Sequence, residues 1–116
     1  MQTYKQLIVW QKAIQLVNEI YAISDQLPKY EQYILISQML RAAISIPSNI
    51  AEGSRRGHKP EYIQFLSIAI ASAAELETQL IITKNRYLKV NCILAEQLLD
   101  EIQRMLYTII QKLKTN

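Results

Sequence analysis

The sequence is poor in the residues that break a chain or cross-link it. Its 116 residues include two glycines, three prolines and one cysteine. An all-β domain needs many tight turns, and this supply of turn-forming residues is too small for them. The single Cys92 excludes an internal disulfide. Long helices joined by a few turns are therefore the fold class that the composition favours.

The sequence also lacks long hydrophobic runs. Charged and amide side chains interrupt the N-terminal segment, which therefore does not resemble a secretion signal. No stretch of about 18 apolar residues free of charge occurs, so we expect neither a transmembrane helix nor membrane contact. A chain of this length can form one domain that buries about two thirds of its unfolded surface. We predict a single cytoplasmic domain over residues 1–116.

Hydrophobic residues make up half of the chain, and they recur at alternating steps of three and four. This spacing places them on one face of a helix. Pro28 and Pro60 mark two helix boundaries, because proline ends a helix that precedes it and fits the first turn of the next one. The pattern predicts four helices, over about 5–26, 30–56, 60–86 and 91–114. Short connections favour antiparallel neighbours, so we predict an all-α, up-and-down antiparallel four-helix bundle.

The second and third helices are each predicted to bury one stripe of side chains. In the second helix the stripe consists of Tyr33, Ile36, Leu40, Ala43, Pro47 and Ile50. In the third helix it consists of Tyr62, Leu66, Ala69, Ala73, Leu76, Leu80, Thr83 and Tyr87. The second of these lists is an unbroken heptad pattern. Both stripes are expected to face the centre of the bundle.

Apolar residues also occur outside these stripes. The first and fourth helices carry additional ones at seven-residue spacing. The third helix has an edge of small residues, Ser67, Ala71, Ser72 and Ala74. Two interpretations stay open: either the chain self-associates, since monomers seldom expose large apolar patches, or the core is simply wide.

Pro47 falls inside the second predicted helix. Proline removes one backbone hydrogen bond and clashes with the preceding turn, at a cost of about 3 kcal/mol. We therefore expect this helix to be kinked near Pro47. The alternative is two short helices that meet at the proline, and either arrangement leaves the bundle intact.

The segment from Arg41 to Gly53, RAAISIPSNIAEG, is the most distinctive part of the sequence. Further distinctive residues are Val9-Trp10-Gln11-Lys12-Ala13, Leu27-Pro28 with Glu31, Ser37-Gln38, Phe65-Leu66, and Ala69 with Ser72, Glu75-Leu76 and Gln79-Leu80. Together they resemble the four-helix-bundle proteins encoded in intervening sequences of bacterial 23S ribosomal RNA genes. The sequence departs from that pattern at Ile70-Ala71, where relatives often carry an Arg-Gly pair, and at Arg86, where a glycine is expected.

This resemblance implies a bundle that assembles as a ring-shaped homopentamer and has no established enzymatic activity. More distantly, the sequence is similar to the accessory proteins of diversity-generating retroelements. Those proteins share the bundle, form pentameric barrels and engage nucleic acid and a reverse transcriptase. The expected partners are therefore further copies of the chain and RNA or DNA, with a protein partner as the alternative.

Polar residues recur along the second helix at steps of four, four and three, namely Arg41, Ser45, Asn49 and Glu52. Glu75 on the third helix can complete the row. We interpret the row as a buried or half-buried structural clamp that fixes the register of the helices and satisfies backbone groups freed by Pro47. Arg41→Ala is then expected to unfold or dissociate the protein. The alternative is a cluster that contacts a ligand or RNA.

Basic residues gather at the two turns that flank the third helix. They are Arg55, Arg56, His58 and Lys59 before it, and Lys84, Arg86 and Lys89 after it. A helix of about 26 residues spans roughly 39 Å, so the two groups form separate patches in a monomer. In a ring, each patch repeats around the axis and becomes a basic rim that contacts phosphates.

The sequence gives no sign of a catalytic, metal or cofactor site. A di-iron bundle needs Glu-x-x-His pairs, and the only histidine, His58, precedes Glu61 in the reverse order. Cys92 lacks the paired histidine of a nucleophilic site, and residues 53–57 lack the Gly-Lys-Ser/Thr ending of a phosphate-binding loop. We therefore expect a non-enzymatic protein that binds nucleic acid through basic rims. The alternative is a protein-interaction scaffold with no nucleic-acid contact.

Overall fold

The computed structural model describes residues 3–115, which form four α-helices. They are α1 (Ile8–Asp25), α2 (Leu35–Arg55), α3 (Lys59–Arg86) and α4 (Ile93–Lys114). Two 3-10 helices precede the first two of them, η1 (Tyr4–Gln6) and η2 (Lys29–Tyr33). No strand occurs in this part of the chain. The all-α four-helix bundle predicted from the sequence is confirmed.

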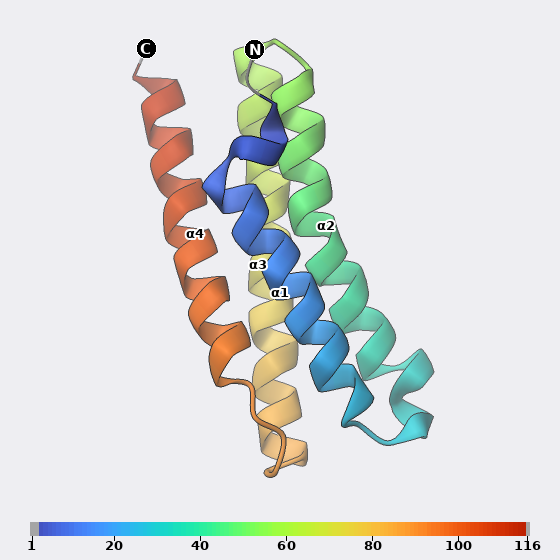
Figure 1. The fold of residues 1–116 in the computed structure, drawn as a ribbon. Coiled ribbons are helices and arrows are strands. Elements are labelled where there is room, and N and C mark those ends of the chain that lie inside the picture. Colours follow the sequence, from blue (N-terminus) through green and yellow to red (C-terminus); the bar gives the residue numbers. More distant parts are fainter. Residues whose placement is uncertain (1–2, 116) are drawn as a thin grey trace.

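The helices stand side by side in a bundle of 46 × 20 × 20 Å (Figure 1). Each helix packs against its neighbours in the sequence, and α4 also packs against α1. Successive helices run in opposite directions (Figure 1). As a result η1, the α2–α3 turn and the last turn of α4 share one end of the bundle, whereas η2 and the α3–α4 turn share the other. We call these the η1 end and the η2 end.

The core follows the predicted stripe of α3 closely. The buried members of that stripe are Leu66, Ala69, Ala73, Leu76, Leu80 and Thr83. Tyr62 and Tyr87, at its two ends, are half-buried. Burial of each large apolar side chain contributes about 1.5–3 kcal/mol, so this stripe accounts for much of the stability of the 28-residue helix.

The start of α2 is a correction to the predicted boundary near residue 30. Residues 29–33 form η2 instead, and Ile34 separates η2 from α2 with φ −117° and ψ −94°, which are not helical angles. The predicted stripe fails in its first half, where Tyr33 is 86% exposed, and holds in its second half, where Ala43, Pro47 and Ile50 are buried. The buried residues of α2 are Leu35, Met39, Ala42, Ala43, Ile46, Pro47, Ile50 and Gly53.

Pro47 lies inside α2, and the helix continues through it. The alternative of two short helices is therefore wrong, whereas the axis of α2 bends in its middle part (Figure 1), in agreement with the predicted kink. Two side chains bond back to the preceding turn. The Ser48 hydroxyl donates to Ile44 O at 2.8 Å, and the Asn49 amide donates to Ser45 O at 2.8 Å. Pro47 has no N–H to donate to Ala43 O, and these two bonds go to the carbonyls of the next two residues rather than to that one.

The two glycines of the chain allow the passage from α2 to α3. Gly53 is buried, and a Cβ atom added there would lie 2.7 Å from the Phe65 Cβ and 3.0 Å from the Tyr62 Cδ1. Only glycine therefore lets the two helices approach this closely. Gly57 lies in the turn itself and has φ +65°, a conformation that other residues adopt at a cost.

The outward side of α3 is apolar as well. By length and composition alone α3 is apolar enough to cross a membrane, with a mean hydropathy of 1.5 over 18 residues, a criterion that core helices also meet. Only 33% of that window is buried in the bundle. The exposed small and apolar residues along it are Ser67, Ile68, Ala71, Ala74, Thr78, Ile81 and Ile82. We call this set the outer face of α3.

Candidate nucleic-acid interface

Segments that are far apart in the sequence bring basic residues together at the η1 end (Figure 1). Their Lys and Arg residues are Lys5, Arg55, Arg56, Lys59, Lys112 and Lys114, and the described acidic residues beside them are Glu52 and Glu61. The η2 end is more balanced. Its basic residues are Lys29, Lys84, Arg86 and Lys89, and its acidic ones are Asp25, Glu31 and Glu96. The positive charge of the protein is thus concentrated at the η1 end.

Arg56, which directly follows α2, is held by two carboxylates and an aromatic ring. Its guanidinium nitrogens lie 3.1 Å from Glu52 Oε1 and 3.6 Å from Glu61 Oε2. Its Cζ lies 5.1 Å from the centre of the Phe65 ring. His58 Nδ1 also contacts Glu61, at 3.3 Å. These are surface pairs worth at most about 1 kcal/mol each, so they orient Arg56 more than they stabilise the fold.

Arg55 differs from its neighbour because it makes no ion pair or hydrogen bond within residues 3–115. Its exposed side chain borders a groove of about 650 Å³ at the η1 end. The groove is lined by Thr3, Tyr4, Leu7, Ser54, Arg55, Gly57 and Tyr62. Burial raises the pKa of the Tyr62 hydroxyl above its ordinary value of 10.0. The remaining cation predicted here, Lys59, is exposed in the first turn of α3.

At the η2 end the predicted cations are mostly engaged by carboxylates. Lys84 Nζ lies 2.7 Å from Glu96 Oε2, and this hydrogen bond raises the pKa of Lys84. Arg86 Nε lies 4.0 Å from Glu31 Oε2. Lys89 is exposed in the α3–α4 turn and has no ion pair in the part of the chain that the structure describes. Of the three, only Lys89 is available to a phosphate without competition.

Glu31 is the buried acid of the η2 end, with 4% of its surface exposed. The Tyr87 hydroxyl donates to Glu31 Oε2 at 2.5 Å, and the Tyr30 and Tyr87 hydroxyls are 3.1 Å apart. The bond to Glu31 is the main cause that raises the pKa of Tyr87 to about 12. A buried carboxylate needs such partners, so we interpret the cluster as a structural link between η2 and the end of α3.

The seven residues predicted to bind nucleic acid therefore fall into two groups. Arg55, Arg56, His58 and Lys59 come together at the η1 end, and Lys84, Arg86 and Lys89 lie at the η2 end. The 28 residues of α3 between them span about 42 Å. One subunit cannot combine the two groups in a single site, as the sequence predicts.

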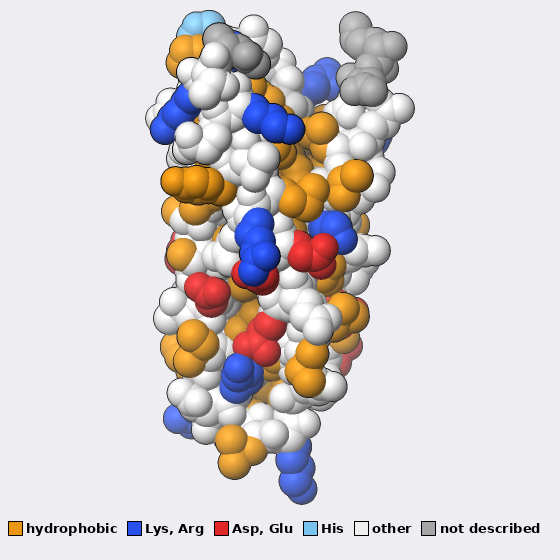
Figure 2. All heavy atoms as spheres, turned by 90° about the vertical axis from the view of Figure 1, so that its left-hand side faces the viewer, with side chains coloured by type: hydrophobic (Ala, Val, Ile, Leu, Met, Phe, Trp, Pro, Cys, Tyr) orange, Lys and Arg blue, Asp and Glu red, His pale blue; other side chains and the backbone are white. Residues whose placement is uncertain are grey.

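The side of the bundle seen in Figure 2 has no continuous basic surface. Basic, acidic and hydrophobic side chains are interspersed on it. Ion pairs on the sides of the bundle join Lys12 to Glu101 and Asp100 to Arg104, each at 3.0 Å. This face of the bundle therefore offers a polyanion no continuous basic surface.

The structure assembles the middle of the predicted polar clamp. The hydroxyls of Ser45 on α2 and Ser72 on α3 are 2.8 Å apart, and the Asn49 amide donates to Ser45 Oγ at 2.9 Å. Ser72 is buried, and the other two side chains are half-buried. Ser72, expected on an outward edge of small residues, therefore faces α2. The three side chains form one hydrogen-bonded contact between the helices.

The outer members of the predicted clamp lie elsewhere, which corrects that prediction. Arg41, Glu52 and Glu75 are all exposed. Glu52 pairs with Arg56, and within residues 3–115 Arg41 and Glu75 make no ion pair or hydrogen bond. Steps of four, four and three drift around a helix, so only the centre of the row faces α3.

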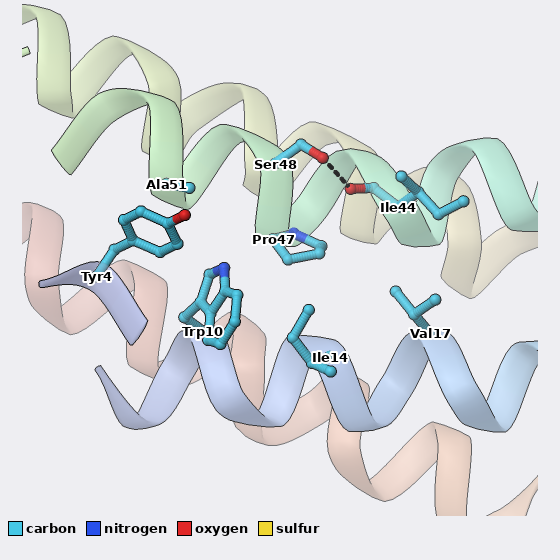
Figure 3. Close-up of a pocket in the computed structure, with 8 residues that line it drawn as sticks. All are labelled: Tyr4, Trp10, Ile14, Val17, Ile44, Pro47, Ser48 and Ala51. Atoms are coloured by element: carbon cyan, nitrogen blue, oxygen red, sulfur yellow. Dashed lines mark hydrogen bonds between the residues drawn. The ribbon is translucent and has the colours of Figure 1, made fainter. Parts of the chain in front are cut away.

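A second groove, of about 300 Å³, lies between α1 and α2 (Figure 3). It is lined by Tyr4, Trp10, Ile14, Val17, Ile44, Pro47, Ser48 and Ala51. Figure 3 shows the side chains of Trp10 and Ile14 directed toward Pro47 across the groove. The Tyr4 ring packs edge-on against Trp10, with ring centres 5.4 Å apart. This groove suits apolar side chains rather than phosphate.

The described residues offer little for catalysis. Within residues 3–115 no group of three or more His, Cys, Asp or Glu side chains could hold a metal ion. Cys92 is buried next to the start of α4, and burial raises the pKa of its thiol. A thiol that stays protonated is a poor nucleophile.

Sequence reasoning missed most of the counterions and half of the basic residues of the η1 end. Two pairs had a readable signal, since Glu52–Arg56 and His58–Glu61 are spaced by four and three residues. The pair of Lys84 with Glu96 joins different helices and had none. The η1 end also contains Lys5, Lys112 and Lys114. Their position there follows from the antiparallel order of the helices and could have been deduced from it.

Comparison with known proteins gives a match that covers most of the chain. The family model described as 23S rRNA-intervening sequence protein matches residues 5–108. The match extends from η1 into α4 and includes the α2–α3 side of the groove at the η1 end, whereas Thr3 and Tyr4 lie outside the matched residues. No curated protein matches the chain.

Proposed function

The chain belongs to the 23S rRNA-intervening sequence protein family, and from this premise we propose that it is a non-enzymatic, oligomeric helical bundle that binds the nucleic-acid backbone. The family description favours RNA as the partner. DNA presents the same phosphates and is the alternative backbone.

The observation that carries this proposal is the charge of the η1 end. Six Lys and Arg residues meet two Glu residues there, and Arg55 has no partner within residues 3–115. Lys and Arg contacts to phosphates supply most of the affinity of non-specific nucleic-acid binding and need no deep pocket. The side seen in Figure 2 has no continuous basic surface, which also favours this end over that side.

We also propose that copies of the chain assemble through the outer face of α3, five to a ring as the family resemblance implies. The exposed Ile68, Ile81 and Ile82 supply apolar area on this face. Ala71 and Ala74 between them would let another helix approach closely. Assembly would repeat the η1 end around an axis, and several weak phosphate contacts would then act together.

Binding of a fragment of structured ribosomal RNA at increasing salt concentration tests the proposal. Affinity is expected to fall steeply, because each phosphate contact adds about −0.7 to −0.9 to the slope of log K against log salt. Lys112→Gln with Lys114→Gln at the η1 end should lower both the affinity and the slope.

The matched control is Lys29→Gln with Lys89→Gln, which removes the same charge at the η2 end. This pair is expected to leave affinity nearly unchanged. Absence of binding at low ionic strength would contradict the proposal. Equal losses for the two pairs would show that the η1 end is not the interface.

The apolar groove between α1 and α2 favours a second candidate, a protein-interaction scaffold. Its lining includes the partly exposed side chains of Ile14 and Ile44, which an apolar partner could cover. In that case a purified complex would survive nuclease treatment. It would be lost in Ile44→Glu and retained in Lys112→Gln with Lys114→Gln, and the opposite pattern would favour nucleic-acid binding.

A further inference from the structure

The groove at the η1 end has the size of a small-ligand site. Its volume of about 650 Å³ falls within the roughly 300–1,000 Å³ of typical ligand pockets. None of its described lining residues is acidic. Gly57 adds no side chain to its rim, and a Cβ atom there would meet nothing within 4 Å, so the space above the turn is open. An anionic ligand can therefore enter without meeting a carboxylate in the lining.

Three side chains of the lining have unused binding capacity. Arg55 is exposed and has no ion pair or hydrogen bond within residues 3–115. The hydroxyls of Tyr4 and Tyr62 have no hydrogen-bond partner in the same part of the chain. Both rings are half-buried, so they are held in place and still accessible. The groove thus combines one free guanidinium with two aromatic rings.

This combination matches the chemistry of a nucleotide. A base has two flat faces that stack on aromatic rings, and the attached phosphate pairs with a guanidinium. We propose that the groove holds one nucleotide of single-stranded RNA, with its base against the rings of Tyr4 and Tyr62 and its phosphate at Arg55. The inference rests on the proposed function and adds a ligand class to it, since phosphate contacts alone do not distinguish single strands from duplexes.

Single strands are the ligand because bases in a duplex are already stacked and paired. A groove of this kind can receive only a base that is free to leave its neighbours. The surrounding basic residues, such as Lys112 and Lys114, would bind the phosphates of either form. The structure therefore predicts a general affinity for RNA and an added preference for unpaired nucleotides.

The test compares two probes, oligouridylate and the duplex that it forms with oligoadenylate, by fluorescence anisotropy at low salt. Wild-type protein is expected to bind the single strand more tightly. Tyr62→Leu and, separately, Tyr4→Leu should weaken single-strand binding about tenfold and leave duplex binding unchanged. Arg55→Gln should weaken both. The matched control is Tyr33→Leu, which removes an exposed ring at the η2 end.

Tyr62 also packs against the core, so circular dichroism must show that Tyr62→Leu is folded. If it is not, Tyr4→Leu decides the question. Equal binding of single strand and duplex, with no effect of either tyrosine variant, would overturn this inference and leave the proposed function standing. Failure of wild-type protein to bind both probes at low salt would overturn the two together.

Discussion

At the scale of single residues, Gly53 is the position most sensitive to added volume. A Cβ atom would lie 2.7 Å from the Phe65 Cβ, which is the inner atom of a side chain and cannot swing away. Overpacking costs about 1–3 kcal/mol, more than the gain of about 1 kcal/mol in helix propensity. We expect Gly53→Ala to lower the free energy of unfolding by a net amount of up to about 2 kcal/mol, as measured by urea denaturation.

Gly57→Ala serves as the comparison for Gly53→Ala. Its Cβ would meet no atom, and the cost of about 1 kcal/mol would come from the positive φ alone. We therefore expect Gly53→Ala to disturb the packing of Tyr62 and Phe65 and Gly57→Ala to leave it unchanged. Near-ultraviolet circular dichroism detects changes in the packing of aromatic rings. A midpoint that does not fall in Gly53→Ala would show that α3 can move away from α2.

The Tyr87 hydroxyl gives a prediction about alkaline pH. Its folded-state pKa of about 12 is above the ordinary value of 10.0, so its contribution to stability is fully present below pH 10.0 and is lost as pH rises through about 12. Tyr87→Phe should be less stable than wild type at neutral pH, because Glu31 loses its donor. The difference in unfolding free energy should shrink between these two pH values.

Chemical denaturation at a series of pH values measures that difference, with Tyr33→Phe as the exposed control. The ultraviolet absorbance of tyrosinate would follow ionisation of Tyr87 directly. A difference that stays constant through the alkaline range would mean that Tyr87 does not depend on Glu31 in solution.

At the scale of elements, the contact between α2 and α3 centres on Ser45 and Ser72. Removal of either hydroxyl should cost about 1 kcal/mol, and the double variant should cost less than the sum of the two, because they share one hydrogen bond. Arg41→Ala, in contrast, should keep the wild-type melting temperature within the scatter of surface substitutions. Strictly additive losses would contradict the Ser45–Ser72 bond.

This expectation for Arg41 replaces part of the one drawn from the sequence, where Arg41→Ala was expected to unfold or dissociate the protein. Because the Arg41 side chain is exposed, its removal gives no reason to expect unfolding of the subunit. An exposed side chain can still contact another subunit, so loss of assembly stays a possible result. Sedimentation of Arg41→Ala therefore separates a contact between subunits from one within the subunit.

The helices were predictable from the sequence to different degrees. The heptad of α3 has one consistent register, so six of its seven buried residues were identified correctly, the exception being Ser72. In α2 the apolar residues occupy adjacent positions such as Leu35 and Ile36, which allows two registers, and the wrong one placed Tyr33 in the core. The choice depends on the bend at Ile34 and on the burial of Glu31, both of which are set by contacts with distant residues.

At the scale of the whole molecule, the candidate site could be predicted only in part. The basic α2–α3 turn is contiguous in the sequence and was found there. The groove beside Arg55 was not, because Tyr4 and Tyr62 come from opposite halves of the chain and meet only when η1 folds over the turn. The neutralising carboxylates of the η2 end were missed for the same reason.

The outer face of α3 gives a prediction about assembly. Ile68→Glu with Ile82→Glu should convert the oligomer to a monomer, because two charges would be buried in the proposed interface. Leu88→Glu, which changes an exposed leucine of the α3–α4 turn, is the control and should leave assembly unchanged. Analytical ultracentrifugation distinguishes the outcomes, and an unchanged sedimentation coefficient in the double variant would place the interface elsewhere.

The 46 Å length of the bundle also has a consequence for the rate at which the protein associates with a nucleic acid. The Debye length at physiological ionic strength is about 8 Å, so a nucleic acid near one end does not sense the charges of the other. Under the proposed function, attraction to the η1 end alone would exert a torque that turns the bundle end-on before contact. Such steering accelerates association more than it slows dissociation. Added salt should therefore act mainly on the rate at which complexes form.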